Sequence, residues 1–141
     1  MTAVALWSAF FTVASAALAP VALLFLRIML SVMFIDSGRR HLMFLKERAK
    51  DLDLPQWFTF ILGAVEVAGG ALVLVGLFAQ TAALFLAIVM LGALYFKFFI
   101  WKTGIYGEKG EGWYYDAFLL AGVGVVFTIG AGPLSLSAFL L

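Results

Sequence analysis

Long apolar runs, separated by two charged segments, make up most of this sequence. Residues 55–78 carry a single charge, Glu66, and residues 82–101 carry only Lys97. Such a run, folded as an α-helix that rises ~1.5 Å per residue, can span the ~30 Å hydrocarbon core of a bilayer. A further apolar run covers residues 113–129. The pattern predicts an all-α integral membrane protein, a four-helix bundle with an additional N-terminal hydrophobic helix.

The first apolar run, residues 3–38, is too long to cross a bilayer as one straight helix, because it would extend about 54 Å. We expect it to break at Pro20, since proline suits the first turn of a new helix. Residues 1–19 then form an N-terminal hydrophobic segment, a candidate fifth helix that spans the membrane or lies against the bundle. Residues 20–141 form the four-helix transmembrane domain. Ala17-Leu18-Ala19 resembles the end of a signal peptide, but a basic start is missing, so we expect the segment to be retained.

The composition excludes several classes of protein. Of the 141 residues, 65% are hydrophobic and 12% are charged, whereas soluble domains carry roughly 25% charged residues. The chain has no cysteine and a single histidine, His41, so we expect no metal site and no intrinsic cofactor such as haem. Nothing in the charge pattern indicates a nucleic-acid partner. His41 lies among polar residues, and we expect it to be solvated.

The basic residues of the predicted loops all fall in residues 39–54 and 102–112, which four core spans place on one face of the membrane. These residues are Arg39, Arg40, Lys46, Arg48, Lys50, Lys102 and Lys109. Because basic loops face the cytoplasm, we expect both loops to be cytoplasmic in a prokaryotic plasma membrane, with the C-terminus outside. Interfacial anchors fall at the same boundary, namely Trp57, Trp101 and Trp113.

Glu66 lies near the middle of its span, where an ionisable side chain costs ~2.5 kcal/mol or more unless it is compensated. Counted from the expected helix ends at Gly38 and Pro55, Arg27 and Glu66 lie at the same depth, about 16 Å. We therefore expect Arg27 and Glu66 to form a buried charged pair. Such a pair either fixes the register of two helices or belongs to a functional site, and the sequence leaves both readings open.

A second set of polar side chains lies within about two helical turns of the same interface. The set consists of Asp36, Lys97, Tyr115 and Asp116. Asp36 and Asp116 both need a cationic or hydrogen-bonding partner, and Lys97 is the obvious candidate. Glycines beside Glu66 favour close helix packing and also leave space for a ring or a hydrocarbon tail. The candidate small-molecule pocket is lined by Arg27, Glu66, Gly69, Gly70, Asp36, Lys97, Tyr115 and Asp116.

The motif around Glu66 carries a resemblance to a known family. It reads Gly63-x-x-Glu66-x-x-Gly69-Gly70, followed by Leu74 and Gly76-Leu77, and preceded in the first span by a basic residue, Phe34 and Gly38. Together with the glycine- and proline-containing tail from Gly130 to Ser137, it resembles the DoxX family of small bacterial and archaeal membrane proteins. The resemblance implies a four-helix bundle linked to redox metabolism, similar to the small subunit of thiosulfate:quinone oxidoreductase, and it implies soluble redox partners.

Three functions are compatible with these features. The first is a membrane subunit of a quinone-linked redox complex, in which the charged pocket receives the quinone, the cytoplasmic face docks a partner, and a centre in that partner supplies the electrons. The second is a non-catalytic assembly or anchor subunit of a membrane complex. The third is a small proton-coupled permease, which requires a homo-oligomer because four spans are few for a carrier.

Overall fold

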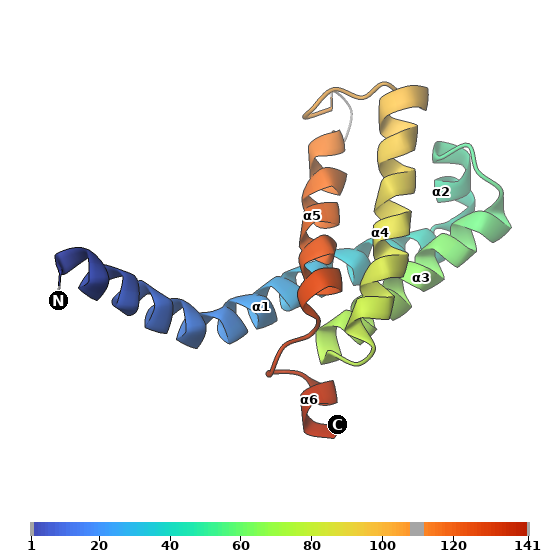
Figure 1. Ribbon diagram of the computed structural model, residues 1–141. Helices are drawn as coiled ribbons and strands as arrows, with labels where there is room; N and C mark the ends of the chain where they lie inside the picture. The colour runs from blue at the N-terminus through green and yellow to red at the C-terminus, as the bar shows by residue number, and fades with distance from the viewer. Residues whose placement is uncertain (1, 108–111, 141) are drawn as a thin grey trace.

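The computed structural model describes residues 2–107 and 112–140, which form six α-helices and one π-helix. In chain order these are α1 (Ala3–Met43), α2 (Leu45–Asp51), α3 (Gln56–Val75), α4 (Ala79–Tyr95), the π-helix η1 (Phe96–Ile100), α5 (Trp113–Ile129) and α6 (Leu136–Leu140) (Figure 1). No strand occurs among the described residues. Three helical stretches, Ala3–Met43, Gln56–Val75 and Ala79–Ile100, are long and apolar enough to cross a membrane, and α5 is a shorter apolar helix. The prediction of an all-α membrane bundle is confirmed.

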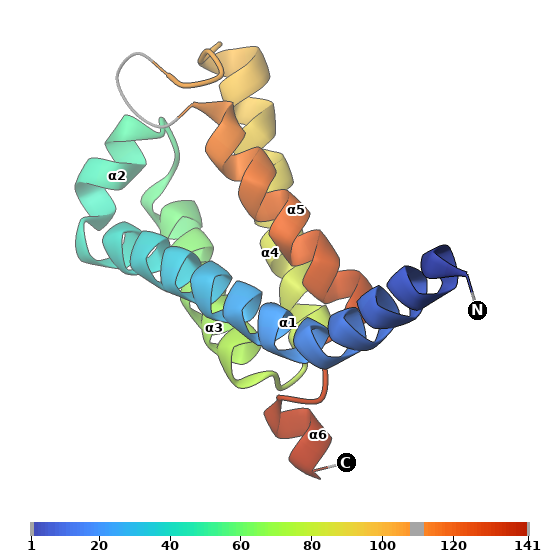
Figure 2. The ribbon, with the colours of Figure 1, turned by 90° about the vertical axis from the view of Figure 1, so that its left-hand side faces the viewer.

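Two antiparallel helix pairs build the bundle. α1 packs along α3, α4 packs along α5, and contacts between α3 and α4 join the two pairs (Figure 2). The core between the pairs is apolar, and Phe34, Val73, Leu86 and Val123 are almost completely buried in it. Each of these four side chains comes from a different helix of the two pairs. The bundle therefore has one shared core, although its two pairs are inclined to each other.

α1 and α3 cross in direct backbone contact where two glycines face each other. A Cβ atom added to Gly38 would lie 2.6 Å from the carbonyl oxygen of Gly63, and one added to Gly63 would lie 2.9 Å from the carbonyl oxygen of Gly38. Farther along α3, Gly70 is covered by Phe34 of α1, and Gly69 is covered by Leu86 of α4. The glycines therefore serve close helix packing, and neighbouring helices fill the space that the sequence suggested for a ring or a tail.

Pro20 does not end a helix. α1 continues through it from Ala3 to Met43, so the predicted break is wrong. Proline removes one helical hydrogen bond and deflects the axis, whereas the apolar residues on both sides favour helix where no water can satisfy the backbone. α1 accordingly changes direction along its length (Figure 1). Residues 3–19, here called the N-terminal arm, project beyond the bundle and leave nearly all of their apolar side chains exposed.

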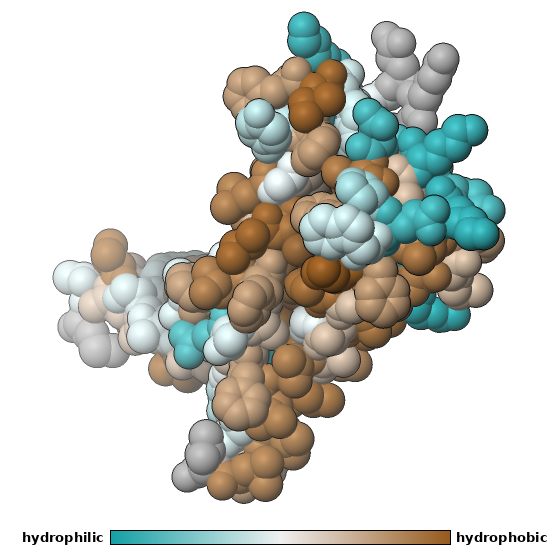
Figure 3. Space-filling model, turned by 90° about the vertical axis from the view of Figure 1, so that its right-hand side faces the viewer, coloured by the Kyte–Doolittle hydropathy of each residue, from teal (hydrophilic) through white to brown (hydrophobic). Residues whose placement is uncertain are grey.

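The two charged segments lie at the same end of the molecule. α2 and residues 101–107, which follow η1, both lie at the upper end of Figure 2, whereas α6 lies at the lower end. Hydrophilic residues gather at the upper end in the space-filling view (Figure 3). This arrangement agrees with a common face for residues 39–54 and 102–112. The cytoplasmic orientation of that face stays a prediction, and Lys109 lies outside the described residues.

Replacement of Gly38 by alanine should destabilise the protein, because the new methyl group would press on the backbone of α3 and on the Cβ atom of Glu66, 2.9 Å away. We expect the free energy of unfolding to fall by about 1–3 kcal/mol, as overpacking causes in other cores. Gly92→Ala is the matched control, since nothing lies within 4 Å of a Cβ atom added to this helical glycine. It should stabilise α4 by roughly 0.5–1 kcal/mol. Unfolding in detergent micelles measures both changes, and equal effects would contradict the close crossing.

Candidate functional site

Glu66 is buried at the α1–α3 crossing, where it contacts His41. Its Oε2 atom lies 2.9 Å from Nδ1 of His41, and the two side chains are 3% and 13% exposed. His41 follows Gly38 by three residues on the same face of α1, so the glycine contact also brings this pair together. The expectation that His41 is solvated is therefore wrong. A carboxyl group hydrogen-bonded to an imidazole can exchange protons, and here the imidazole lies toward the charged end of the molecule.

The predicted pair between Arg27 and Glu66 is wrong, because the two helices pack in a different register. Gly38 faces Gly63 rather than Pro55, since α1 continues to Met43 instead of ending near Gly38. Counted from this crossing, Arg27 is level with Leu74 of α3. Glu66 lies eight residues before Leu74, about 12 Å away along the helix axis. The two charges consequently occupy separate sites.

Arg27 binds four backbone carbonyl groups. Its Nε donates to Val73 at 2.8 Å and its Nη2 donates to Leu74 at 2.7 Å, while Nη1 donates to both Ala131 and Leu134 at 2.8 Å. These bonds use four of the five N–H groups of the guanidinium, and the residue is only 1% exposed. Arg27 is thus held by the backbone and has no access to a ligand.

Two of the carbonyl groups that Arg27 binds lie at a helix end, where they have no helical partner. Val73 and Leu74 lie in the last turn of α3, where the N–H groups of Gly76 and Leu77 both bond to Leu72 instead. Gly76 takes a left-handed conformation, with φ of 73°, and a Cβ atom there would meet the guanidinium at 2.5 Å. Arg27 therefore completes the C-terminal cap of α3 from a neighbouring helix.

The other two carbonyls belong to residues 130–135, here called the C-terminal strap, which follows α5. Ser135 fixes the strap through hydrogen bonds, because its Oγ donates to Gly132 at 2.6 Å and accepts from Ala138 at 3.3 Å. The backbone N–H of Ser137 also donates to Gly76, at 3.4 Å. A helix C-terminus carries a partial charge of roughly −0.5, so the end of α3 and the two strap carbonyls together offset part of the positive charge of Arg27.

Lys97 and Asp116 form a second buried ion pair at the charged end of the bundle. Nζ of Lys97, on η1, lies 2.5 Å from Oδ2 of Asp116, on the first turn of α5, and the side chains are 14% and 7% exposed. Lys97 also donates to the carbonyl of Gly112 at 3.4 Å. The prediction that Lys97 could serve Asp116 is thus confirmed, whereas Asp36 instead pairs with Arg40 one turn later on α1, where both side chains are exposed.

The eight residues of the predicted pocket are distributed over separate places. Arg27 caps α3, Glu66 lies at the α1–α3 crossing, and the pair of Lys97 and Asp116 joins α4 to α5. The remaining ones have packing or surface positions: Gly69, Gly70 and Tyr115 lie against the core and Asp36 is exposed. Within the described ranges, no three His, Asp or Glu side chains come together as a metal-binding group. Sequence reasoning missed His41, and its three-residue spacing from Gly38 could have revealed it.

Comparison with known proteins gives one finding. The family model for DoxX matches residues 22–99, which is more than half of the chain and contains Arg27, Gly38, His41 and Glu66. Neither a curated protein nor a solved structure matches the chain.

Replacement of Arg27 by methionine should reduce the free energy of unfolding by about 3 kcal/mol or more, because hydrogen bonds from a charged donor contribute roughly 1.5–3 kcal/mol each. Arg27→Lys should recover only part of the loss, since an ammonium group cannot reach four carbonyls in the planar geometry of a guanidinium. Arg40→Lys is the control, because Arg40 is exposed. Unfolding in micelles gives the stabilities, and digestion by carboxypeptidase reports release of the strap. An Arg27→Lys variant as stable as wild type would contradict the four-carbonyl arrangement.

Removal of one partner from the buried pair at the charged end should also be costly. Lys97→Met leaves the carboxylate of Asp116 buried without its cation, and we expect a loss of about 3–5 kcal/mol in the free energy of unfolding. The double variant Lys97→Met with Asp116→Leu should restore most of that stability, because both charges are then absent. A double-mutant cycle measured by unfolding tests this coupling. Additive losses would show that the two side chains act independently.

Proposed function

The chain belongs to the DoxX family of membrane proteins, and from this we propose that it is a membrane subunit of a quinone-linked redox complex of the thiosulfate:quinone oxidoreductase type. Its own contribution is the exchange of protons through the pair of His41 and Glu66. The electrons come from a redox centre in a partner subunit, since the chain has one histidine and no cysteine with which to hold such a centre.

The observation that carries the proposal is the hydrogen bond between a buried carboxyl group and a less buried imidazole. Reduction of a quinone to a quinol adds protons as well as electrons to its two oxygen atoms. Glu66 in its acid form donates a proton to a reduced quinone oxygen, and His41 in its imidazolium form then reprotonates the carboxylate. His41 recovers its proton from water at the charged end, so each turnover restores the pair.

The proposal places the quinone ring at an interface with the partner, at the edge of the α1–α3 crossing beside His41 and Glu66, which are 13% and 3% exposed. Neighbouring helices already fill the positions beside Gly38, Gly69 and Gly70, so a ring has no room inside the described bundle. The partner docks on the face that carries α2, whose charged side chains lie next to the end of α1 that holds His41. Both the electron donor and the proton source would then approach the quinone from one end of the molecule.

The N-terminal arm favours a second candidate function, that of an assembly or anchor subunit. Nearly all residues of the arm are exposed, and small side chains recur along it at helical spacing: Ala5, Ser8, Ala9, Thr12, Ser15, Ala16 and Ala19. Small residues let transmembrane helices approach closely, so such an arm suits contact with a helix of another subunit. In that case, the buried charges fix the fold of the chain and take no part in a reaction.

Purified complex carrying Glu66→Gln tests the two candidates against each other. Glutamine can still hydrogen-bond to His41 but cannot donate a proton as an acid, so the redox function predicts intact assembly with quinol formation slower by about 10²-fold or more. Asp36→Asn is the control, because Asp36 is exposed and pairs with Arg40. Mass spectrometry of the gently solubilised complex should detect bound quinone and a flavin, haem or iron–sulfur partner. Wild-type protein without either of these, or a Glu66→Gln variant of full activity, would contradict the proton-exchange function.

A further inference from the structure

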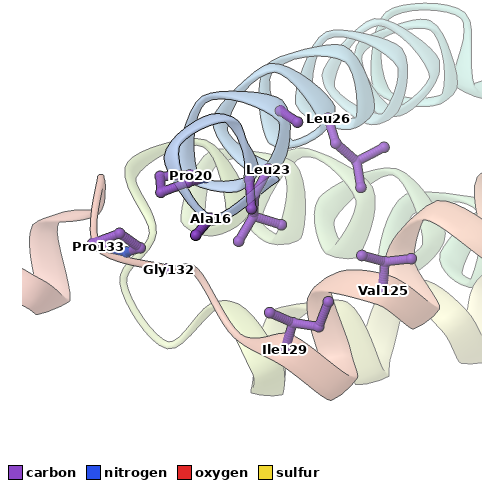
Figure 4. A pocket seen from close by; sticks show the side chains of 10 residues that line it. Ala16, Pro20, Leu23, Leu26, Val125, Ile129, Gly132 and Pro133 are labelled. Atoms are coloured by element: carbon purple, nitrogen blue, oxygen red, sulfur yellow. The ribbon is translucent and has the colours of Figure 1, made fainter. Parts of the chain in front are cut away.

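An apolar groove opens beside Pro20, where α1 diverges from α5 (Figure 4). Its volume is about 440 Å³, within the range of pockets that hold small ligands. α1, the last turns of α5 and the C-terminal strap supply its walls, and none of the lining side chains is polar or charged. Because the helices that form it are those of a membrane protein, the open side of this groove meets lipid rather than water.

The two ends of the groove differ in depth. Leu26 and Val125 line one end, and Pro20 and Pro133 line the other (Figure 4). α5 ends at Ile129 and the strap follows, so the end at Pro133 lies toward the membrane surface. The end at Leu26 therefore lies toward the hydrocarbon interior. A ligand with an apolar chain and a polar head would enter with its chain toward Leu26.

Pro20 provides the polar feature at the outer end. Proline has no N–H group, so Pro20 cannot donate the usual helical hydrogen bond to the carbonyl of Ala16, four residues earlier. Ala16 itself lines the groove. In a bilayer, a carbonyl freed in this way requires another donor. Ala16 and Pro20 lie one turn apart on α1 and both line the groove, so we take this carbonyl as a hydrogen-bond acceptor at the outer end.

We propose that this groove holds a single phospholipid with a hydrogen-bond donor in its headgroup, namely phosphatidylethanolamine. One acyl chain lies along Leu23, Leu26 and Ile129, and the ammonium group donates to the carbonyl of Ala16. The absence of charged side chains from the lining removes any advantage for an anionic headgroup. Phosphatidylcholine offers the same chains without an N–H donor, so it fills the groove but leaves the carbonyl unpaired. The bound lipid packs against the bend of α1 at Pro20, where the N-terminal arm joins the rest of the helix.

Native mass spectrometry of the full chain, released from micelles with equal amounts of added phosphatidylethanolamine and phosphatidylcholine, tests this proposal. We expect one retained lipid per chain and a preference for phosphatidylethanolamine of about tenfold, as one charge-assisted hydrogen bond provides. Pro20→Ala restores the N–H donor to Ala16 and should abolish the preference while the lipid is still retained. No preference in the wild type, or an unchanged preference in Pro20→Ala, would overturn the assignment of the headgroup.

A second pair of variants tests the position of the acyl chain. Ala16→Trp places a large ring in the groove and should reduce lipid retention by about tenfold or more. Ala17→Trp is the matched control, because Ala17 is exposed on the same helix and does not line the groove. It should retain lipid as the wild type does. Equal retention by the two variants, or recovery of an isoprenoid quinone in place of the phospholipid, would overturn the proposal of a bound phospholipid. Either outcome leaves the function proposed for Glu66 unaffected.

Discussion

The architecture depends on a guanidinium group that is neutralised by backbone rather than by a carboxylate. Arg27 lies among the carbonyls of the α3 end and the C-terminal strap, and no charged partner accompanies it among the described residues. The C-terminus of α3 and the strap carbonyls supply the compensating negative potential. This arrangement decides where α3 stops and how the chain after α5 folds back. It also fixes one wall of the apolar groove.

The remaining buried charges are each satisfied within a pair, and the two pairs differ in chemical capacity. Lys97 and Asp116 join two helices end to end, as a structural ion pair does. His41 and Glu66 form the one buried pair of the described chain that joins an imidazole to a carboxyl group, a combination suited to proton exchange. The proposed function leaves the first pair a structural role and uses the second for proton exchange. This difference in chemical capacity between the two pairs follows from their residue types and from their burial.

The helix class and the positions of the last three spans followed from the sequence, because apolar runs interrupted by single charges leave few alternatives in a membrane. The resemblance to DoxX rested on Glu66 and the glycines around it, which the family comparison supports over residues 22–99. Pairing between helices could not be derived in the same way. A depth count requires the true ends of the helices, and α1 extends past both Pro20 and Gly38. One error of eight residues in register was enough to assign Glu66 to Arg27 instead of His41.

The strap has a consequence for how the protein is made. Arg27 and its acceptor Ala131 are separated by 104 residues of sequence. At ~5–20 residues per second, a ribosome completes that interval in roughly 5–20 s. α1 is then already in the translocation machinery, with a cation that lacks all four of its final acceptors until Leu74 is made and two of them until the strap follows. The surrounding apolar residues must hold the helix in place through this delay, and the strap completes the binding of a charge inserted 104 residues earlier.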